Sequence, residues 1–237
     1  KEISPHEDWY TIVCDSEKDV ILTFGKIWNR FKPEIQIGFN DSQYDWPFIM
    51  GKIIQYDILH EMLTMMSCMP LTNKIEKSMV IKHNWIETKL NIMDSRITDY
   101  WPLNSSIKID SELSHDITFL KIPGSVHLDV RPCFMKIYPI KGSEATSSKL
   151  KEFLRVCKLD NKEPLAIHDM WDIYREGDPD KMIDVAKYCV IDAKRCQDLM
   201  VVKNVYNDYR EIAALAYVSF HEVYLYANGS RVLNLVA

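Results

Sequence analysis

The sequence predicts an α/β domain, and three observations support this prediction. Short runs of apolar and β-branched residues alternate with longer segments whose apolar residues recur at helical spacing. The clearest strand, at 35–39, ends in a polar turn that leads into a helix-like segment from Asp45 to Met66. The 237-residue chain is 47% hydrophobic, which is enough apolar material for a packed core. We therefore expect helices layered against strands.

The segments before residue 70 alternate between strand and helix. Aromatic and β-branched residues predict a strand at 9–14, and the helix that follows over 18–31 ends at Lys32-Pro33. Four apolar residues give this helix one buried face: Ile21, Phe24, Trp28 and Phe31. The strand at 35–39 and a single helix over 45–66 complete this part.

The middle of the chain is the least regular. Residues 70–125 hold scattered aromatic residues among many polar ones, which predicts an insertion of loops and short strands, including a hairpin. A buried strand at 125–130 follows a Pro-Gly turn. The polar segment 142–148 is expected to form a loop before a short amphipathic helix at 149–156.

The last third is helical in pattern. A short helix is expected over 169–176, and a long helix begins at Pro179 and continues as far as Tyr209. Six residues predict its inner face: Ile183, Ala186, Val190, Ala193, Gln197 and Met200. Shorter segments at 213–217 and 221–226 follow.

Composition excludes several classes of protein. The formal net charge of −5 argues against a module that coats nucleic acid with a basic surface. The six cysteines form neither a C-x-x-C pair nor a zinc-finger cluster, so we expect reduced thiols in an intracellular protein. The sequence has no apolar run long enough for a membrane span and no signal-peptide pattern, so no membrane partner is expected.

Two carboxylates stand where an α/β fold places functional groups. Asp45 lies where the strand at 35–39 gives way to a helix, and ligands bind at the carboxyl ends of strands in such folds. Tyr188 and Asp192 are spaced i, i+4 and share one face of the long helix. Structural roles fit equally well: a helix N-cap for Asp45, a turn for Asn40, and a polar helix surface for the Tyr188 pair. Position alone leaves both alternatives open.

The joint pattern is more specific than its parts. Asn40-x-x-x-Tyr44-Asp45 after an apolar strand resembles the second exonuclease motif of the proofreading domain of family B DNA polymerases. Tyr188-x-x-x-Asp192 on a later helix resembles the third motif. Flanking residues extend the resemblance to most of the chain, because similar family segments correspond to 32–40, 45–49 and 226–232. The greatest similarity to polymerases of nucleocytoplasmic large DNA viruses, notably mimivirus-like giant viruses, is found at 120–124 and 127–131.

The resemblance implies a fold and a domain plan. The fold would be RNase-H-like, with a mixed sheet flanked by helices. The exonuclease domain would span residues 1–210, with an insertion at about 70–125, and 211–237 would connect it to the polymerase palm.

The resemblance also implies an activity. Mispaired nucleotides would be hydrolysed from the 3′ end of a primer by a mechanism that uses two Mg²⁺ or Mn²⁺ ions. Asp45 and Asp192 would bind the metals, Tyr188 would orient the attacking water, and Asn40 and Tyr44 would contact the single-stranded DNA.

The partners that the resemblance implies are DNA, the palm, fingers and thumb of the same parent chain, and a processivity factor like a sliding clamp. A viral polymerase of this kind would work inside the host cell, in the cytoplasm or the nucleus.

The first exonuclease motif, Asp-x-Glu on a strand, has no good match. Asp15-Ser16-Glu17 precedes a helix and is interpreted as its cap, so we expect the true motif upstream of Lys1. The chain also starts without methionine and stops in an apolar stretch, so we expect a fragment. Because it would hold only part of the carboxylates of the metal site, we expect it to have little or no nuclease activity when isolated. Asp129, on the strand at 125–130, is interpreted as a core hydrogen-bonding residue rather than a site residue.

Two alternatives stay open. The chain could belong to a stand-alone 3′–5′ exonuclease. It could also be a degenerate, non-catalytic exonuclease domain that only binds single-stranded DNA, although Asp45, Tyr188 and Asp192 together argue against that reading.

Overall fold

The computed structural model describes residues 9–69, 105–110, 112–117, 122–140, 142–159, 165–226 and 228–236. Its N-terminal and central elements are α1 (Glu17–Phe31), β1 (Ile35–Gly38), α2 (Asp45–Gln55), α3 (Leu59–Met66), β2 (Ser105–Lys108), β3 (Ser114–Ile117) and β4 (Val126–Asp129). The remaining elements are α7 (Val130–Ile137), α8 (Leu150–Val156), α9 (Ile167–Glu176), α10 (Pro179–Val202), α11 (Val205–Ala216), α12 (Phe220–Leu225) and α13 (Asn228–Val236).

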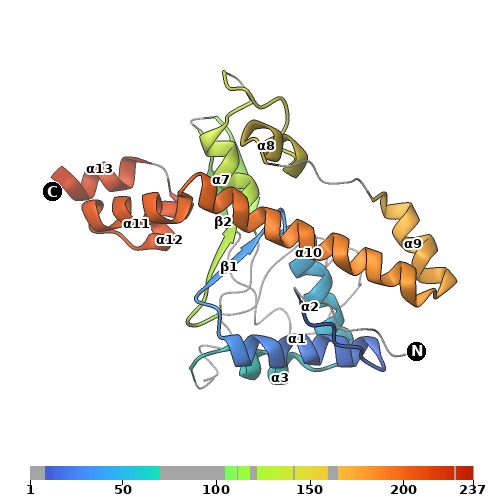
Figure 1. The fold of residues 1–237 in the computed structure, drawn as a ribbon. Helices are drawn as coiled ribbons and strands as arrows, with labels where there is room; N and C mark the ends of the chain where they lie inside the picture. Colours follow the sequence, from blue (N-terminus) through green and yellow to red (C-terminus); the bar gives the residue numbers. More distant parts are fainter. Residues whose placement is uncertain are drawn as a thin grey trace.

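The described part is an α/β domain with short strands and many helices (Figure 1). β1 pairs with β4 in parallel, in a register that places Gly38 opposite Asp129. Because both strands run in the same direction, their carboxyl ends lie side by side at one edge. β2 and β3 form an antiparallel hairpin inside the predicted insertion. The rest of that insertion, at 70–104 and 118–121, lies outside the described residues.

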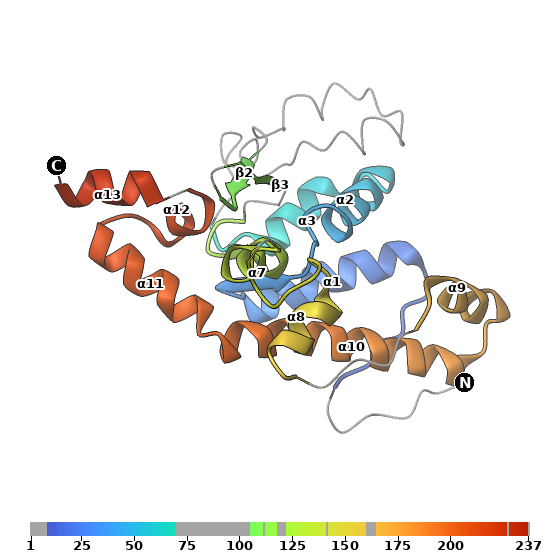
Figure 2. The same ribbon diagram turned by 90° about the horizontal axis from the view of Figure 1, so that it is seen from above.

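Two hydrophobic clusters hold the elements together. The first joins α1, α2 and α3, where the rings of Phe24, Trp28 and Trp46 meet edge to face at 5.9–6.4 Å between centroids. The second surrounds β4 and β1 and takes its large side chains from α7, α8, α10 and α12, among them Phe134, Phe153, Leu199 and Tyr224. In the view from above, α10 lies on one side of α7 and α2 and α3 lie on the other (Figure 2). β1 packs against α10, and the second hydrophobic cluster surrounds the β1–β4 pair.

Two predicted elements are wrong in their extent. Residues 9–14 are irregular rather than a strand, and Tyr10 and Val13 are largely exposed, so their β-branched and aromatic pattern is not used in a sheet. The helix expected over 45–66 is two helices, because Asp57 adopts a left-handed backbone (φ 52°) that ends the first. The break turns α3 so that it packs against α1 near Gly25, where a larger side chain would overlap Met62 and Met65.

The long C-terminal helix also differs from its prediction. α10 ends at Val202 and Asn204, in a left-handed conformation (φ 52°), separates it from α11. Its predicted inner face is wrong at three positions that are exposed: Val190, Ala193 and Gln197. Met200 is buried as predicted, and the inward face also carries the buried Cys196 and Leu199, together with the half-buried Tyr188 and Asp192. Both candidate site residues of this helix thus point toward the body of the domain.

No helix in the described part of the chain combines the length and the apolar character that crossing a membrane requires.

Candidate active site

The loop 39–44 carries the first candidate motif away from the end of β1. Asn40 adopts a left-handed conformation (φ 59°), which bends the chain directly after the strand. The backbone carbonyl of Asp41 then accepts a hydrogen bond from the N–H of Trp46 at 2.9 Å and closes the turn. Tyr44 occupies the N-cap, so Asp45 is the first residue of α2 and the N-cap interpretation of Asp45 is wrong. Its carboxylate is therefore not needed to cap the helix.

Asp45 is affected by burial and by one neighbouring carboxylate, that of Asp41. Its side chain is open to solvent on one side, and burial of the other side, followed by the charge of Asp41, raises the pKa of its carboxyl group. A raised pKa means that the ionised form is disfavoured in the absence of a counterion. A cation bound beside Asp45 would relieve this repulsion.

Two buried carboxylates, those of Asp41 and Asp129, anchor the loop 39–44 to the strand β4. Both carboxylate oxygens of Asp41 lie 2.9 Å from Nε2 of His127, and both residues are almost fully buried. Asp129 accepts hydrogen bonds from the backbone N–H groups of Asn40 (2.8 Å) and Arg131 (2.9 Å) and from the hydroxyl of Ser42 (3.3 Å). The core hydrogen-bonding role expected for Asp129 is therefore confirmed.

Asp129 is fully buried, and its ionisation reflects two opposing effects. Burial, followed by the charge of Asp41, raises the pKa of its carboxyl group to about 6, while the hydrogen bonds from Asn40 and Arg131 act in the opposite direction. Burial is the larger effect because no water reaches the carboxylate.

The close approach at Gly38 yields a stability prediction. A Cβ at this position would overlap the carboxyl group of Asp41, so Gly38→Ala should push Asp41 away from His127. We expect the free energy of unfolding to fall by about 1–3 kcal/mol, the usual cost of overpacking. Urea denaturation followed by tryptophan fluorescence measures the change. Gly229→Ala is the matched control, because a Cβ there meets no atom within 4 Å, and it should cause no loss. Equal stability of the two variants would contradict the assigned packing.

Tyr188 and Asp192 lie one helical turn apart on α10. α10 packs against β1, and α2 follows β1 through the loop 39–44, so the candidate motifs come from elements that adjoin one strand. One carboxylate oxygen of Asp192 is buried, whereas Tyr188 is half-buried. Among the residues that the structure describes, no group of three or more His, Cys, Asp or Glu side chains is arranged to hold a metal ion.

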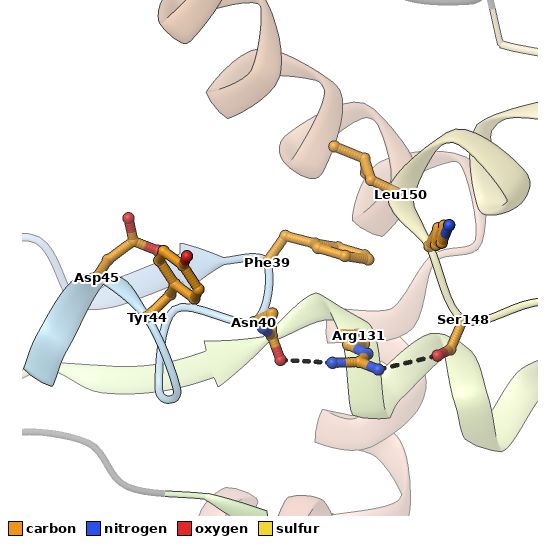
Figure 3. A pocket seen from close by; sticks show the side chains of 8 residues that line it. Phe39, Asn40, Tyr44, Asp45, Arg131, Ser148 and Leu150 are labelled. Carbon is orange, nitrogen blue, oxygen red and sulfur yellow. Dashed lines mark hydrogen bonds between the residues drawn. The ribbon is translucent and has the colours of Figure 1, made fainter. Parts of the chain in front are cut away.

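Two cavities meet at Tyr44 and Asp45. The first, which we call the Arg131 pocket, has a volume of about 430 Å³ and is lined by Phe39, Asn40, Tyr44, Asp45, Arg131, Ser148, Lys149 and Leu150. Figure 3 shows Tyr44 and Asp45 on one side of it and Arg131 and Ser148 on the other. The second, the aromatic groove, has a volume of about 720 Å³ and is lined by side chains of α2, α9 and α10, including Phe48, Trp171 and Tyr174. Asp45 thus stands beside two places that a ligand could enter.

The Asp-x-Glu upstream of this site has a structural role. Ser16 caps α1 by accepting a hydrogen bond from the N–H of Asp19. Glu17 accepts hydrogen bonds from the hydroxyl of Tyr56 (2.6 Å) and the ammonium of Lys52 (2.9 Å), and these contacts lower the pKa of its carboxyl group. The cap confirms the interpretation of this segment as the start of the helix, and Glu17 in addition ties α1 to α2 on the surface.

Sequence reasoning missed Asp41, His127 and Arg131. His127 and Asp129 stand two residues apart on one strand, and this alternation of polar residues in a buried strand was the available signal.

The geometry defines an α/β domain with an acidic site at the carboxyl ends of parallel strands. Residues 1–152 match the model of the family "DNA polymerase family B, exonuclease domain". A protein named DNA polymerase beta, from African swine fever virus isolate Pig/Kenya/KEN-50/1950, is 41% identical over 229 residues, which is 97% of this chain and 17% of that protein. The proteins of the same name from isolates Tick/Malawi/Lil 20-1/1983 and Pig/Portugal/Lis 60/1960 are 41% and 40% identical over the same share.

The chain belongs to the exonuclease-domain family of family B DNA polymerases. The resemblance to polymerases of large DNA viruses is confirmed by these relatives. The chain spans about 17% of the length of the curated relatives that it matches.

Proposed function

We propose that this chain is the proofreading 3′–5′ exonuclease region of a family B polymerase that replicates DNA inside an infected cell, in the cytoplasm or the nucleus. The observation that carries the proposal is the position of Asp45, which follows the end of β1 and lines two cavities. Family membership supplies the reaction class, and the site supplies a carboxylate that is not used as a cap. The DNA substrate and the palm, fingers and thumb are proposed for the parent protein, as is a clamp-like partner.

The domain plan is part of the proposal. Residues 1–210 would form an RNase-H-like domain in which the β1–β4 pair belongs to the central sheet, and 211–237 would lead toward the palm. The hairpin β2–β3 would belong to the insertion at about 70–125.

The donor chemistry fits divalent metal ions. Asp45 and Asp192 offer only oxygen ligands, which Mg²⁺ and Mn²⁺ prefer. Bound ions of this kind lower the pKa of an attacking water and stabilise a leaving 3′ oxygen. Tyr188, one helical turn before Asp192, would hold the water in line, and Asn40 and Tyr44 would hold the frayed strand.

Asp45 and Asp192 alone make an incomplete site. The resemblance to the family implies more than two carboxylates at such a site, so we propose that residues other than Asp45 and Asp192 complete it in the parent protein. The isolated 237-residue chain is then expected to be inactive.

The proposal is tested with the parent polymerase and a 5′-labelled primer that ends in a 3′ mismatch. In Mg²⁺ without nucleotides, the primer should shorten stepwise from its 3′ end, and a fully paired primer should shorten more slowly. Chelation of the metal with EDTA should stop the reaction, and added Mg²⁺ should restore it. Shortening that is absent in both Mg²⁺ and Mn²⁺, with DNA binding retained, would instead indicate a non-catalytic domain.

A further inference from the structure

Arg131 is a half-buried cation that neither the motifs nor the family assign to the site. It lies in the first turn of α7, directly after the end of β4. Its guanidinium donates a hydrogen bond to Oδ1 of Asn40 at 2.7 Å and another to the hydroxyl of Ser148 at 3.1 Å (Figure 3). Both acceptors are neutral. Among the described residues, no carboxylate forms an ion pair with this guanidinium, so its charge is available to a ligand.

The guanidinium also retains hydrogen-bonding capacity. Its Nε is buried and has no acceptor within the described part of the chain. Guanidinium groups bind phosphate oxygens through their N–H groups, and Nη1 and Nη2 each keep a second N–H beyond the contacts to Asn40 and Ser148. The bound Oδ1 of Asn40 leaves its amide N–H₂ as a second donor, because no described residue accepts a hydrogen bond from it.

Charge is arranged across the Arg131 pocket. Asp45 lies on one wall, whereas Arg131 and the exposed Lys149 supply positive charge to the lining. Burial, followed by the charge of Arg131, lowers the pKa of the neighbouring His115 and keeps its imidazole neutral at pH 7. Asp41 and Asp129 are buried beneath the loop and paired with His127 and backbone N–H groups. Arg131 is therefore the half-buried positive charge that faces Asp45.

We propose that Arg131 binds a backbone phosphate of the single-stranded DNA whose 3′ end reaches Asp45. The inference rests on the proposed exonuclease function and adds a binding residue to it. A cavity of about 430 Å³ is within the size range of small-ligand sites and gives room for one nucleotide unit. Arg131 holds the phosphate and, through Oδ1, fixes the carboxamide of Asn40 so that its N–H₂ group faces the same strand.

Because the chain carries a net negative charge, a contact between Arg131 and one phosphate should account for much of the salt dependence of DNA binding. The chain has a formal net charge of −5, so few phosphate contacts are expected on its surface. Each phosphate contact to a single strand contributes about −0.7 to the slope of log K against log salt concentration. Loss of one contact is then a large part of the total slope.

The test is fluorescence anisotropy of a 5′-labelled oligothymidylate with the full 237-residue chain, in EDTA, at several salt concentrations. Arg131→Gln should weaken binding about tenfold at low salt, as for loss of one charge-assisted hydrogen bond, and should reduce the slope by about 0.7. Arg131→Lys should keep the slope of the wild type while losing affinity, because it preserves the charge but not the bridge to Asn40 and Ser148. Arg30→Gln is the matched control, since Arg30 is an exposed arginine at the far end of α1.

The affinity and the salt dependence of the three variants and the wild type decide the inference. An Arg131→Gln variant that binds with the affinity and slope of Arg30→Gln overturns the inference and leaves the exonuclease proposal intact. A lysine variant that loses the slope as the glutamine variant does also overturns it, because the effect would then follow from altered structure rather than from charge. A wild-type chain that binds no single-stranded DNA also overturns the inference, whereas the exonuclease proposal is decided separately by the mismatched-primer assay with the parent polymerase.

Discussion

Asp45→Asn will lower the 3′–5′ exonuclease rate of the parent polymerase by about a hundredfold or more, the usual cost of removing one charged group that stabilises a transition state. Asparagine keeps the shape of the side chain but lacks the negative charge that attracts a divalent cation. The fold should persist because Tyr44, and not Asp45, is the N-cap of α2. Removal of a carboxylate whose pKa is raised by burial and by Asp41 also relieves repulsion, so the variant should be at least as stable as the wild type.

If Asp45 and Asp192 bind the same metal centre, the effects of their substitutions on the exonuclease rate should not add. Asp192→Asn should cause a loss of similar size, and the double variant should lose little more than the worse single variant, because both carboxylates would serve one metal centre. Tyr188→Phe should cost about tenfold, since it removes one hydroxyl that positions water. Single-turnover hydrolysis of a 3′-mismatched primer measures these rates, and polymerase activity reports that the protein is folded.

Asp184→Asn is the matched control for this series. Asp184 lies on α10 two turns before Asp192 and is exposed. The polymerase that carries Asp184→Asn should hydrolyse the primer at the wild-type rate. If Asp45→Asn and Asp192→Asn behave like Asp184→Asn, the two carboxylates do not belong to the catalytic centre.

The strand and loop that carry Asp45 could be predicted from the sequence because their signals are local. The β-branched residues of 35–39 are followed by Asn40, whose left-handed backbone is a common feature of turns after strands. The Arg131–Asn40 contact had no local signal, because the two residues are 91 positions apart and meet only through the parallel pairing of β1 with β4. The Asp41–His127 pair depends on the same register.

The wrong inner face of α10 has a related cause. Hydrophobic periodicity assigns apolar residues to the interior, and it placed Val190 and Ala193 there. In the structure these residues are exposed, and Tyr188 and Asp192 turn inward on the face that continues into Cys196 and Leu199. Local pattern rules are expected to fail where polar residues are held inside for function. The assignment of Tyr188 and Asp192 to the site stays a prediction, which the substitutions above test.

The second large effect that we predict is a loss of stability when the buried carboxylate of Asp129 is removed. Asp129→Ala should lower the free energy of unfolding by about 3–5 kcal/mol, because it leaves the N–H groups of Asn40 and Arg131 without an acceptor in a region that water does not reach. Asp129→Asn should be tolerated. Its side-chain oxygen can accept both backbone hydrogen bonds, and its N–H₂ can donate to the hydroxyl of Ser42, which accepts as readily as it donates.

The difference between the pKa of the Asp129 carboxyl in the folded and the unfolded chain also predicts that stability depends on pH. The pKa of this carboxyl is about 6 in the folded protein and about 3.9 in an unfolded chain, so the folded state binds more protons between these values. Stability from this group is therefore greatest below about pH 4, falls as the pH rises toward 6, and is constant above that, with a total change of about 3 kcal/mol. Asp129→Asn removes the titration. The stability of the asparagine variant relative to the wild type should thus rise between pH 4 and pH 7.

Urea denaturation of the wild type and both variants at pH 4, 5, 6 and 7 measures these differences, and Trp28 and Trp46 in the first hydrophobic cluster report unfolding. Subtracting the wild-type curve cancels the other titrating groups. An asparagine variant as unstable as the alanine variant would show that the negative charge, and not the acceptor geometry, holds the loop. A difference between wild type and Asp129→Asn that stays constant with pH would show that the carboxyl titrates at its ordinary pKa. The first result would contradict the acceptor role of Asp129 in fixing the loop 39–44 to the end of β4, and the second would contradict the raised pKa of its carboxyl group.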